Sequence, residues 1–349
     1  MLIRGIGVVG GFGVGIGALE AALEHPVVAP RSYCAKPDAL ESFVDKRRLR
    51  RLDHFSRMAA LAGFLAFEDA GLAPPRSRCG PDNLGIVVAT GYGASQTTFG
   101  FLDSFIEHGD RLASPTHFSH SVHNAAAANL ALLLGATGAN LTVSQFELSF
   151  GAALLTAAAW LEEGRVTSVL VGGVDEQCAV RDYCWEKFFG ARLENCKPLD
   201  FTRQSAVQGE GAAFFLLARD GKARYGRVGE VQIGAGAPDF ATMGSDAVLI
   251  LGADGHRCYG PQYADALAAV PLARAYAPLY GSFPTAQAMD LAVAGLTLRR
   301  QTLFASPDPE AADGLLQKEL IHLPLPAQDI VCLAFGNGDG WSRITLRDA

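Results

Sequence analysis

The stretch from residue 139 to residue 176 constrains the fold of this chain more than any other. Residues 140–144 (NLTVS) predict a short buried strand, and residues 149–161 predict a helix of small and apolar residues without a single charge. Gly164 follows as a typical C-terminal cap, and residues 166–171 predict a second strand. A helix that is apolar on every side is buried in a larger core rather than lying on a surface. The chain therefore predicts an α/β core with this helix inside it.

The sharp turn between this strand and this helix carries an acidic residue. Glu147 lies at the helix N-terminus, where free N–H groups and the helix dipole favour negative charge. Enzymes often place a nucleophile at such an elbow, and Glu147 is the side chain that this chain offers there. Capping of the helix, or pairing with an arginine, is an equally open interpretation of Glu147.

The composition permits a large core and more than one structural unit. The chain has 349 residues, of which 49% are hydrophobic, so two domains or one duplicated domain are both compatible with its length. A net charge of −7 argues against an extended nucleic-acid surface. Basic residues gather mainly at 46–51 (KRRLRR), which is either solvated surface or a docking patch for an acidic partner.

Neither the cysteines nor the histidines form a recognisable metal motif, and we expect no metal and no cofactor. Seven scattered cysteines do not form a disulfide framework, and three of them lie close in sequence without zinc-type spacing (Cys178, Cys184 and Cys196). Three histidines spaced by three residues have no evident fourth ligand and indicate a polar surface loop (His117, His120 and His123). No apolar run suggests a membrane span and no cleavable signal stands out, so we expect a cytoplasmic protein.

Strands and helices alternate along the chain, which predicts a parallel sheet with helices on both faces. Strands are expected at 2–10, 83–90, 140–144, 166–171, 212–217, 228–234, 248–251, 279–282, 330–334 and 342–346. Helices are expected at 16–23, 55–70, 149–161 and 286–299, with an alanine-rich helix within 117–134. The order strand, turn and small-residue helix occurs twice, at 141–163 and 279–299, which suggests an internal duplication. We place the two halves at 1–220, with the elbow at 141–150, and at 221–349.

Three glycines near the N-terminus match a dinucleotide-binding pattern on paper. Gly5, Gly7 and Gly10 have the GxGxxG spacing, but they lie inside the first predicted strand instead of following it. Close packing of this strand against a helix explains them better.

With these elements placed, the chain resembles the β-ketoacyl synthases of the thiolase-like fold over nearly its whole length. The resemblance is carried by five segments in the family's order: IRGIGVVGGFGVGI, LRRLDHFSRMAALAGFLAFEDAGL, PTHFSHSVHNAAAANLALLLGATG, VLVGGVDE and CKPLDFTRQSAVQGEGAAFFLL. It implies duplicated βαβαβαββ halves in a five-layered α-β-α-β-α arrangement. Glu210, in the Gly–Glu–Gly–Ala signature of the last segment, is expected to be structural.

The catalytic positions depart from the family. Its members need a cysteine thiolate at the elbow, and Glu147 stands there instead. They also need two histidines, whose positions match Asp254, between Ala253 and Gly255, and Met289, six residues before Gly295. No catalytic residue is therefore assigned with certainty, and His256 could replace the first histidine through a local slip.

The resemblance also places residues around the acyl pocket. Pro284 takes the position of a supporting lysine, and Asn337, two residues after Phe335, that of a gating phenylalanine. Phe146 and Phe150 flank the elbow and are further candidates to fill the pocket.

These losses favour a homologue that does not condense. The resemblance is to the chain-length-factor type, which pairs with an active ketosynthase and an acyl carrier protein in type II polyketide, aryl-polyene or fatty-acid-like biosynthesis. The pair, or a homodimer, is expected to form through residues 115–145.

Two enzymatic alternatives remain open. Glu147 and Asp254 could share a pocket and act as acid and base in a thioester decarboxylase or hydrolase. The chain could also be an active 3-oxoacyl-ACP synthase, an acyltransferase whose cysteine is one of four others, with Cys258 near His256 the best match (Cys178, Cys184, Cys258 and Cys332).

Overall fold

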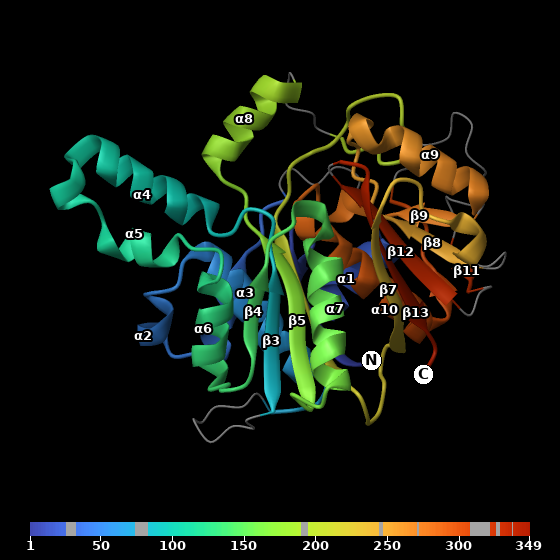
Figure 1. The fold of residues 1–349 in the computed structure, drawn as a ribbon, viewed down its shortest axis with the longest axis horizontal. Coiled ribbons are helices and arrows are strands. Elements are labelled where there is room, and N and C mark those ends of the chain that lie inside the picture. Colours follow the sequence, from blue (N-terminus) through green and yellow to red (C-terminus); the bar gives the residue numbers. More distant parts are fainter. Residues whose placement is uncertain are drawn as a thin grey trace.

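One mixed sheet runs through the part of the chain that the computed structural model describes (Figure 1). The described residues are 1–25, 33–73, 83–189, 195–243, 247–270, 272–307, 322–325, 329–336 and 338–349. The eleven strands of the sheet are β1 (Leu2–Gly10), β2 (Gly13–Val14), β3 (Leu84–Ala89), β4 (Asn140–Val143), β5 (Ser168–Asp175), β6 (Gly211–Ala218), β7 (Arg227–Ala235), β8 (Val248–Leu251), β9 (Ala273–Ala275), β12 (Asp329–Gly336) and β13 (Gly340–Arg347). A separate two-stranded ribbon joins β10 (Thr302–Leu303) and β11 (Leu323–Pro324).

The strand order shows the duplication directly. The first half of the sheet has the order β4-β3-β5-β6-β1, and the second half repeats it outward as β9-β8-β12-β13-β7. In each half three strands are parallel, and the last two alternate in direction. The two halves meet where Leu2 of β1 pairs with Arg227 of β7. The sheet is therefore mixed, and the expectation of a wholly parallel sheet was wrong, because strands buried on both faces do not reveal their direction in sequence.

Helices form three layers around the two halves of the sheet. The α-helices are α1 (Ile16–Glu24), α2 (Lys46–Leu49), α3 (His54–Asp69), α4 (Ser95–His108), α5 (Pro115–His120), α6 (Ala125–Leu134), α7 (Ser149–Glu162), α8 (Ala179–Phe189), α9 (Gly260–Ala269) and α10 (Gln287–Arg300). The outer face of the first half carries α3 and α6, and α9 packs on the outer face of the second half. Between the halves lie α7 and α10, and each contacts strands of both. This is the expected arrangement of five layers.

The charge-free segment after the elbow forms the buried helix α7. Phe150, Leu154 and Leu161 are at most 1% exposed and pack into the central core cluster. Burial of each such side chain contributes about 1.5–3 kcal/mol. The helix ends with Gly164 at φ 66°, a left-handed conformation in which glycine carries no steric penalty.

The N-terminal glycines serve packing. A Cβ on Gly5 would lie 2.2 Å from the carbonyl oxygen of Ala66, and one on Gly7 would lie 2.0 Å from that of Ala62. Both glycines lie in β1, and both carbonyls belong to α3. Close approach of the strand to the helix explains them, as the packing interpretation predicted.

The strand expected at 279–282 does not exist. Ala277–Leu279 forms the short 3₁₀ helix η6, and the strand of this region is β9, at Ala273–Ala275. Leu279 and Tyr280 are buried, so the segment looks like a core strand in sequence, but Pro278 begins a helical turn there. The expected boundary near residue 220 stays a prediction.

Three helices that were not expected, α4, α5 and α8, project from the sheet on one side of the molecule (Figure 1). Large apolar side chains on them are exposed, including Ile106, Phe118 and Phe188. None of the helices in the described ranges is both long and apolar enough to cross a membrane.

Candidate functional site

A cavity of about 550 Å³ lies where the turn before α7, helix α8 and the segment after β8 meet. Its walls come from six parts of the chain that are distant in sequence. They are lined by Tyr92, Glu147, Arg181, Cys184, Trp185, Phe188, Phe189, Gln208, Asp254, His256, Cys258, Tyr259, Ser282, Phe283 and Pro284.

The elbow between β4 and α7 presents Glu147 to this cavity from η3 (Phe146–Leu148). Phe146 has φ 49°, a left-handed conformation that costs a non-glycine residue about 1–3 kcal/mol. Ser149 holds the turn closed: its Oγ accepts from the Gln145 N–H at 2.7 Å and donates to the Phe146 carbonyl at 2.6 Å. The Tyr259 hydroxyl lies 3.5 Å from Glu147 Oε1 across the cavity wall.

Asp254 reaches the same cavity from the segment after β8. The Ser282 hydroxyl donates to its Oδ2 at 2.5 Å, and the backbone N–H of His256 donates to Oδ1 at 3.2 Å. These two donors fix the orientation of the carboxylate. Glu147 and Asp254, which sequence reasoning placed in a shared pocket, do line one cavity.

His256 lies beside Asp254 against an aromatic wall. Its ring centroid is 4.8 Å from that of Trp185 and 5.1 Å from that of Phe189, both on α8. Its Nε2 is 4.0 Å from Asp254 Oδ2, and its Nδ1 is 3.2 Å from the Gln204 side-chain amide. Among the described residues that line the cavity, His256 is the one histidine, whereas condensation in the family uses two.

Several residues expected at the pocket lie in the core instead. Met289 is fully buried in α10 against Gly211, and Phe150 packs on Phe215 with ring centroids 5.7 Å apart. Phe335 packs on Tyr263 at 4.9 Å. The reason is the same for all three: they lie on strand or helix faces that point between the layers.

Of the other expected pocket residues, Pro284 lines the cavity. Phe146 is 45% exposed and packs edge-on against Tyr92, with ring centroids 5.6 Å apart, so it lies outside the lining. Asn337 lies outside the described residues.

The candidate cysteines fall into two groups. Cys178 and Cys332 are buried away from the cavity, whereas Cys184 and Cys258 line it. Burial, and then the negative charges of Asp254 and Glu147, raises the pKa of the Cys258 thiol above its ordinary value. Because the thiolate is the nucleophile, the carboxylates of this cavity work against acyl transfer to Cys258.

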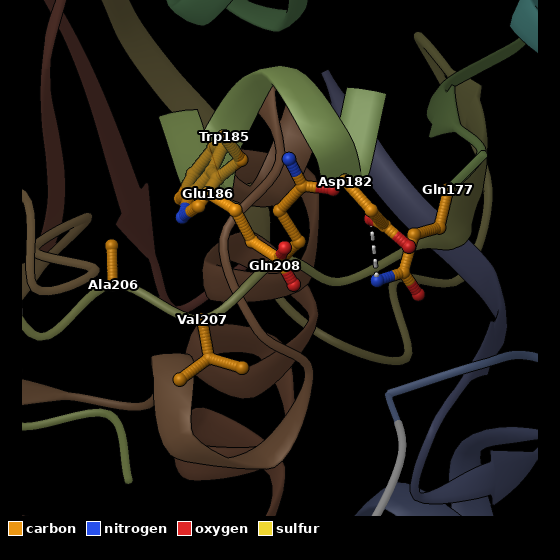
Figure 2. A pocket seen from close by; sticks show the side chains of 7 residues that line it. All are labelled: Gln177, Asp182, Trp185, Glu186, Ala206, Val207 and Gln208. Atoms are coloured by element: carbon orange, nitrogen blue, oxygen red, sulfur yellow. Dashed lines mark hydrogen bonds between the residues drawn. The ribbon is translucent and has the colours of Figure 1, made fainter. Parts of the chain in front are cut away.

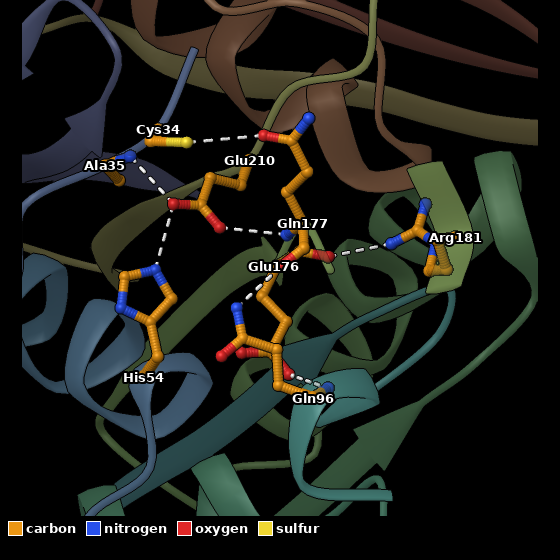
Figure 3. A network of polar contacts seen from close by, with 8 residues as sticks. All are labelled: Cys34, Ala35, His54, Gln96, Glu176, Gln177, Arg181 and Glu210. Atoms are coloured by element: carbon orange, nitrogen blue, oxygen red, sulfur yellow. Dashed lines mark hydrogen bonds and ion pairs between the residues drawn. The ribbon is translucent and has the colours of Figure 1, made fainter. Parts of the chain in front are cut away.

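Beside the cavity, Glu210 organises a network of polar contacts (Figure 3). Its carboxylate accepts from the Ala35 N–H at 2.8 Å, from the Gln177 N–H at 2.9 Å and from His54 Nε2 at 2.9 Å. Burial lowers the pKa of His54, but the hydrogen bond and charge of Glu210 outweigh it and raise that pKa above its ordinary value. These contacts hold three distant segments together, which is what a structural glutamate would do.

The neighbouring Glu176 belongs to the same network. Its Oε1 accepts from the Gln96 N–H at 2.7 Å, at the start of α4, and its backbone carbonyl accepts from Arg181 at 2.8 Å, on α8. Burial raises the pKa of Glu176 to about 7. Glu176 therefore ties the bases of both projecting helices to the end of β5.

A second, smaller hollow lies under α8, with a volume of about 30 Å³ (Figure 2). Figure 2 shows Asp182 and Trp185 of α8 above it, with Gln177 donating to Asp182 at 3.2 Å. The hollow has room for a water molecule rather than for a substrate. In the described ranges no group of three or more His, Cys, Asp or Glu side chains is arranged to hold a metal ion.

The aromatic wall of α8 was missed in sequence. Residues 183–189 (YCWEKFF) contain four aromatic side chains, a density that signals a binding surface. Trp185, Phe188 and Phe189 have the i, i+3, i+4 spacing of one helix face, but the helix was not predicted. Two further lining residues, Tyr259 and Arg181, belong to no recognisable sequence motif.

Comparisons with known proteins agree with this fold. Residues 21–223 match the family model "Beta-ketoacyl synthase, N-terminal domain". That match covers more than half of the chain, and the chain belongs to the β-ketoacyl synthase family.

Individual relatives are distant. The chain is 26% identical over 189 residues to 3-oxoacyl-[acyl-carrier-protein] synthase I, chloroplastic, of Hordeum vulgare, a match that covers 51% of this chain and 40% of that protein. The chain thus spans less than half the length of this curated relative.

Solved structures show the same fold at low identity. A β-ketoacyl synthase from Burkholderia phymatum STM815 has a TM-score of 0.80 at 17% identity, covering 100% of this chain and 99% of the other. The ishigamide ketosynthase/chain length factor has a TM-score of 0.78 at 17% identity, covering 100% and 98%.

Proposed function

We propose that this chain is a non-condensing member of the family that supports an active ketosynthase, in the manner of a chain length factor. The observation that carries the proposal is the carboxylate of Glu147 at the elbow, facing the cavity where a thiolate is required. An acyl–glutamate anhydride would hydrolyse readily, so this position does not suit thioester-like storage. The likeness to a ketosynthase/chain length factor supports the proposal at the level of fold.

The surface at residues 115–145 suits a partner subunit. Strand β4 is the edge of the sheet, so within the described part of the chain one side of its backbone has no strand neighbour. Leu141 on this strand is 42% exposed, and Leu132 and Phe118 nearby in sequence are more exposed still. An open edge with apolar side chains is what a strand of a second subunit would cover.

An acyl carrier protein is proposed as the second partner. The name of a relative, 3-oxoacyl-[acyl-carrier-protein] synthase, includes this carrier, and the basic segment 46–51 presents exposed side chains around the buried Leu49. Lys46 is already paired with Glu41 at 2.9 Å, which leaves the arginines as the main contact candidates. Positive charge of this kind steers an acidic partner to its docking site.

Co-expression with an active ketosynthase tests the proposal. We expect the two chains to co-purify and the pair to elongate acyl chains, while this chain alone is inert. Leu141→Lys on the β4 edge should weaken the complex, whereas the matched Val180→Lys, on an exposed face of α8, should not. A pair that fails to form, or an isolated chain that condenses, would refute the proposal.

A carboxylate-based thioester decarboxylase or hydrolase is the second candidate, because Glu147 and Asp254 line one cavity. Two carboxylates in a partly desolvated site can divide the roles of acid and base. Glu147→Gln should then abolish turnover of malonyl or acyl thioesters by the isolated chain. Turnover that Glu147→Gln leaves unchanged would reject this candidate, and so would a lack of turnover by the wild-type chain.

A further inference from the structure

We propose that the cavity binds a small organic cation, with an ammonium group near the two carboxylates and its carbon chain against the aromatic wall. The inference rests on the proposed function, since it takes Glu147 as a permanent carboxylate of the cavity and not as an acyl-storing group. It adds a chemical class of ligand for this cavity that differs from the acyl groups held by the condensing members of the family.

The charges of the lining favour a cation. Glu147 and Asp254 contribute two carboxylates from different walls, and Arg181 is the one lysine or arginine among the described lining residues. Arg181 is engaged by other groups: its guanidinium lies 3.9 Å from the centre of the Tyr92 ring, and its Nη1 donates to the Glu176 carbonyl at 2.8 Å. The described lining therefore carries two carboxylates against one guanidinium, a net negative charge.

Burial and the negative charge of the carboxylates raise the pKa values of two titratable groups near them. Burial, and then the charge of Glu147, raises the pKa of the Tyr259 hydroxyl. Cys258 is affected in the same direction, with Asp254 as its stronger charged neighbour. Both groups resist the addition of another negative charge, and the same field attracts a positive one.

The rest of the lining suits the body of such a ligand. Trp185, Phe188 and Phe189 of α8 form one wall, and Tyr259 and Phe283 contribute aromatic rings from other walls. Aromatic faces attract ammonium groups as well as apolar chains, and cages of this kind recognise organic cations in other proteins. The volume of about 550 Å³ is in the range of small-molecule sites.

The carboxylate of Asp254 is already oriented by hydrogen bonds before a cation binds. Ser282 and the His256 N–H hold its two oxygens in place, and a carboxylate retains further acceptor sites after two hydrogen bonds. A preorganised carboxylate binds a cation without the cost of ordering its own side chain.

Three probes of equal length test the inference: n-octylammonium, n-octanol and n-octanoate, each titrated below its micelle-forming concentration into the purified full chain. Calorimetry measures affinity, and the change in tryptophan fluorescence that is lost in Trp185→Phe reports occupancy of the cavity. We expect octylammonium to bind about tenfold or more tightly than octanol, with octanoate the weakest. Octanol or octanoate binding as tightly as octylammonium would overturn the inference.

Isosteric variants test whether the carboxylates of Glu147 and Asp254 attract the cation. Glu147→Gln and Asp254→Asn should each weaken octylammonium binding about three- to tenfold and leave octanol binding unchanged. Glu107→Gln, at an exposed position of α4, is the matched control and should change neither. Unchanged melting temperatures show that the variants fold, and equal octylammonium binding by wild type and both cavity variants would overturn the inference.

The result also separates this inference from the proposed function. A chain that supports an active ketosynthase but prefers octanoate would overturn the cation inference alone. Acylation of a cysteine in this chain would overturn the proposed function, whatever the probes show.

Discussion

Helices α7 and α10 occupy equivalent places in the two halves of the molecule, but their N-terminal ends differ. The turn before α7 presents the carboxylate of Glu147 to the cavity. The turn before α10 presents Ser282, Phe283 and Pro284, and Met289, at the family's second histidine position, is fully buried in the first turn of the helix. The core of each helix is preserved, while the chemistry at its tip has changed.

This difference shows that fold and reaction depend on separate residues. Apolar packing between the layers keeps both helices in place, and neither Glu147 nor Pro284 is needed for that packing. Substitutions inside α10 should therefore affect stability, and substitutions at the tip of α7 should affect the cavity alone.

Met289→Ala should have the largest effect on stability. It removes a fully buried side chain that packs against Gly211, and truncation of a buried methionine costs about 2–5 kcal/mol of unfolding free energy. Urea denaturation followed by circular dichroism measures the change. Glu147→Ala is the contrast at the tip of α7 and should cost less than about 1 kcal/mol; a larger loss for Glu147→Ala than for Met289→Ala would contradict the comparison.

The next largest effect concerns the neighbouring Asp290 of α10, which is hydrogen-bonded to the Tyr280 hydroxyl. Burial raises the pKa of Asp290 from 3.8 to about 7. Between these values the native state keeps a proton that the unfolded chain has lost, so the unfolding free energy falls as pH rises from about 4 to 7, by about 4 kcal/mol.

Asp290→Asn should remove this pH dependence. Glu176 titrates in the same range, so denaturation at several pH values is best compared in a Glu176→Gln background. A pH profile that is unchanged by Asp290→Asn would show that the carboxyl is ionised in the folded protein.

Glu210→Gln should produce a smaller loss of stability. The carboxylate accepts hydrogen bonds from two backbone N–H groups and from His54, and an amide cannot accept all three. A cost of about 1–3 kcal/mol follows from the unsatisfied donor. Melting temperatures measure it, and an unchanged value would show that the network does not hold these segments together.

The smallest effect concerns the reactivity of the Cys258 thiol and not the stability of the protein. Asp254→Asn removes one of the charges that raise the pKa of Cys258, so its alkylation by iodoacetamide at neutral pH should accelerate about three- to tenfold. Mass spectrometry of the labelled peptide gives the rate, with the exposed Cys34 as an internal control. Equal rates in both proteins would mean that Asp254 does not act on the thiol.

The sequence predicts the layered core well because its signals are local. The charge-free helix at 149–161, the glycines of β1 and the alternation of strands and helices each follow from neighbouring residues. The direction of β6 and β13 is not a local property, and the hidden strand β9 has only three residues. For these reasons the parallel sheet and the strand at 279–282 were wrong.

The cavity was only partly predictable. Glu147 and Asp254 could be placed together because the family pattern aligns both positions. Met289 and Phe150 could not be separated from the pocket in sequence, since apolar side chains beside an elbow fit a core or a pocket equally well. The aromatic wall of α8 depends on how the long connection between β5 and β6 folds back over the cavity. No periodicity in the sequence reveals this path.

The most direct measurement asks where an acyl group is held. The chain and the proposed ketosynthase partner are incubated with an acyl-carrier thioester, and every cysteine is examined by mass spectrometry. We predict acylation of the partner's elbow cysteine and none of any cysteine in this chain, including Cys184 and Cys258 of the cavity. A stable acyl group on Cys258 would contradict the proposal that this chain does not condense.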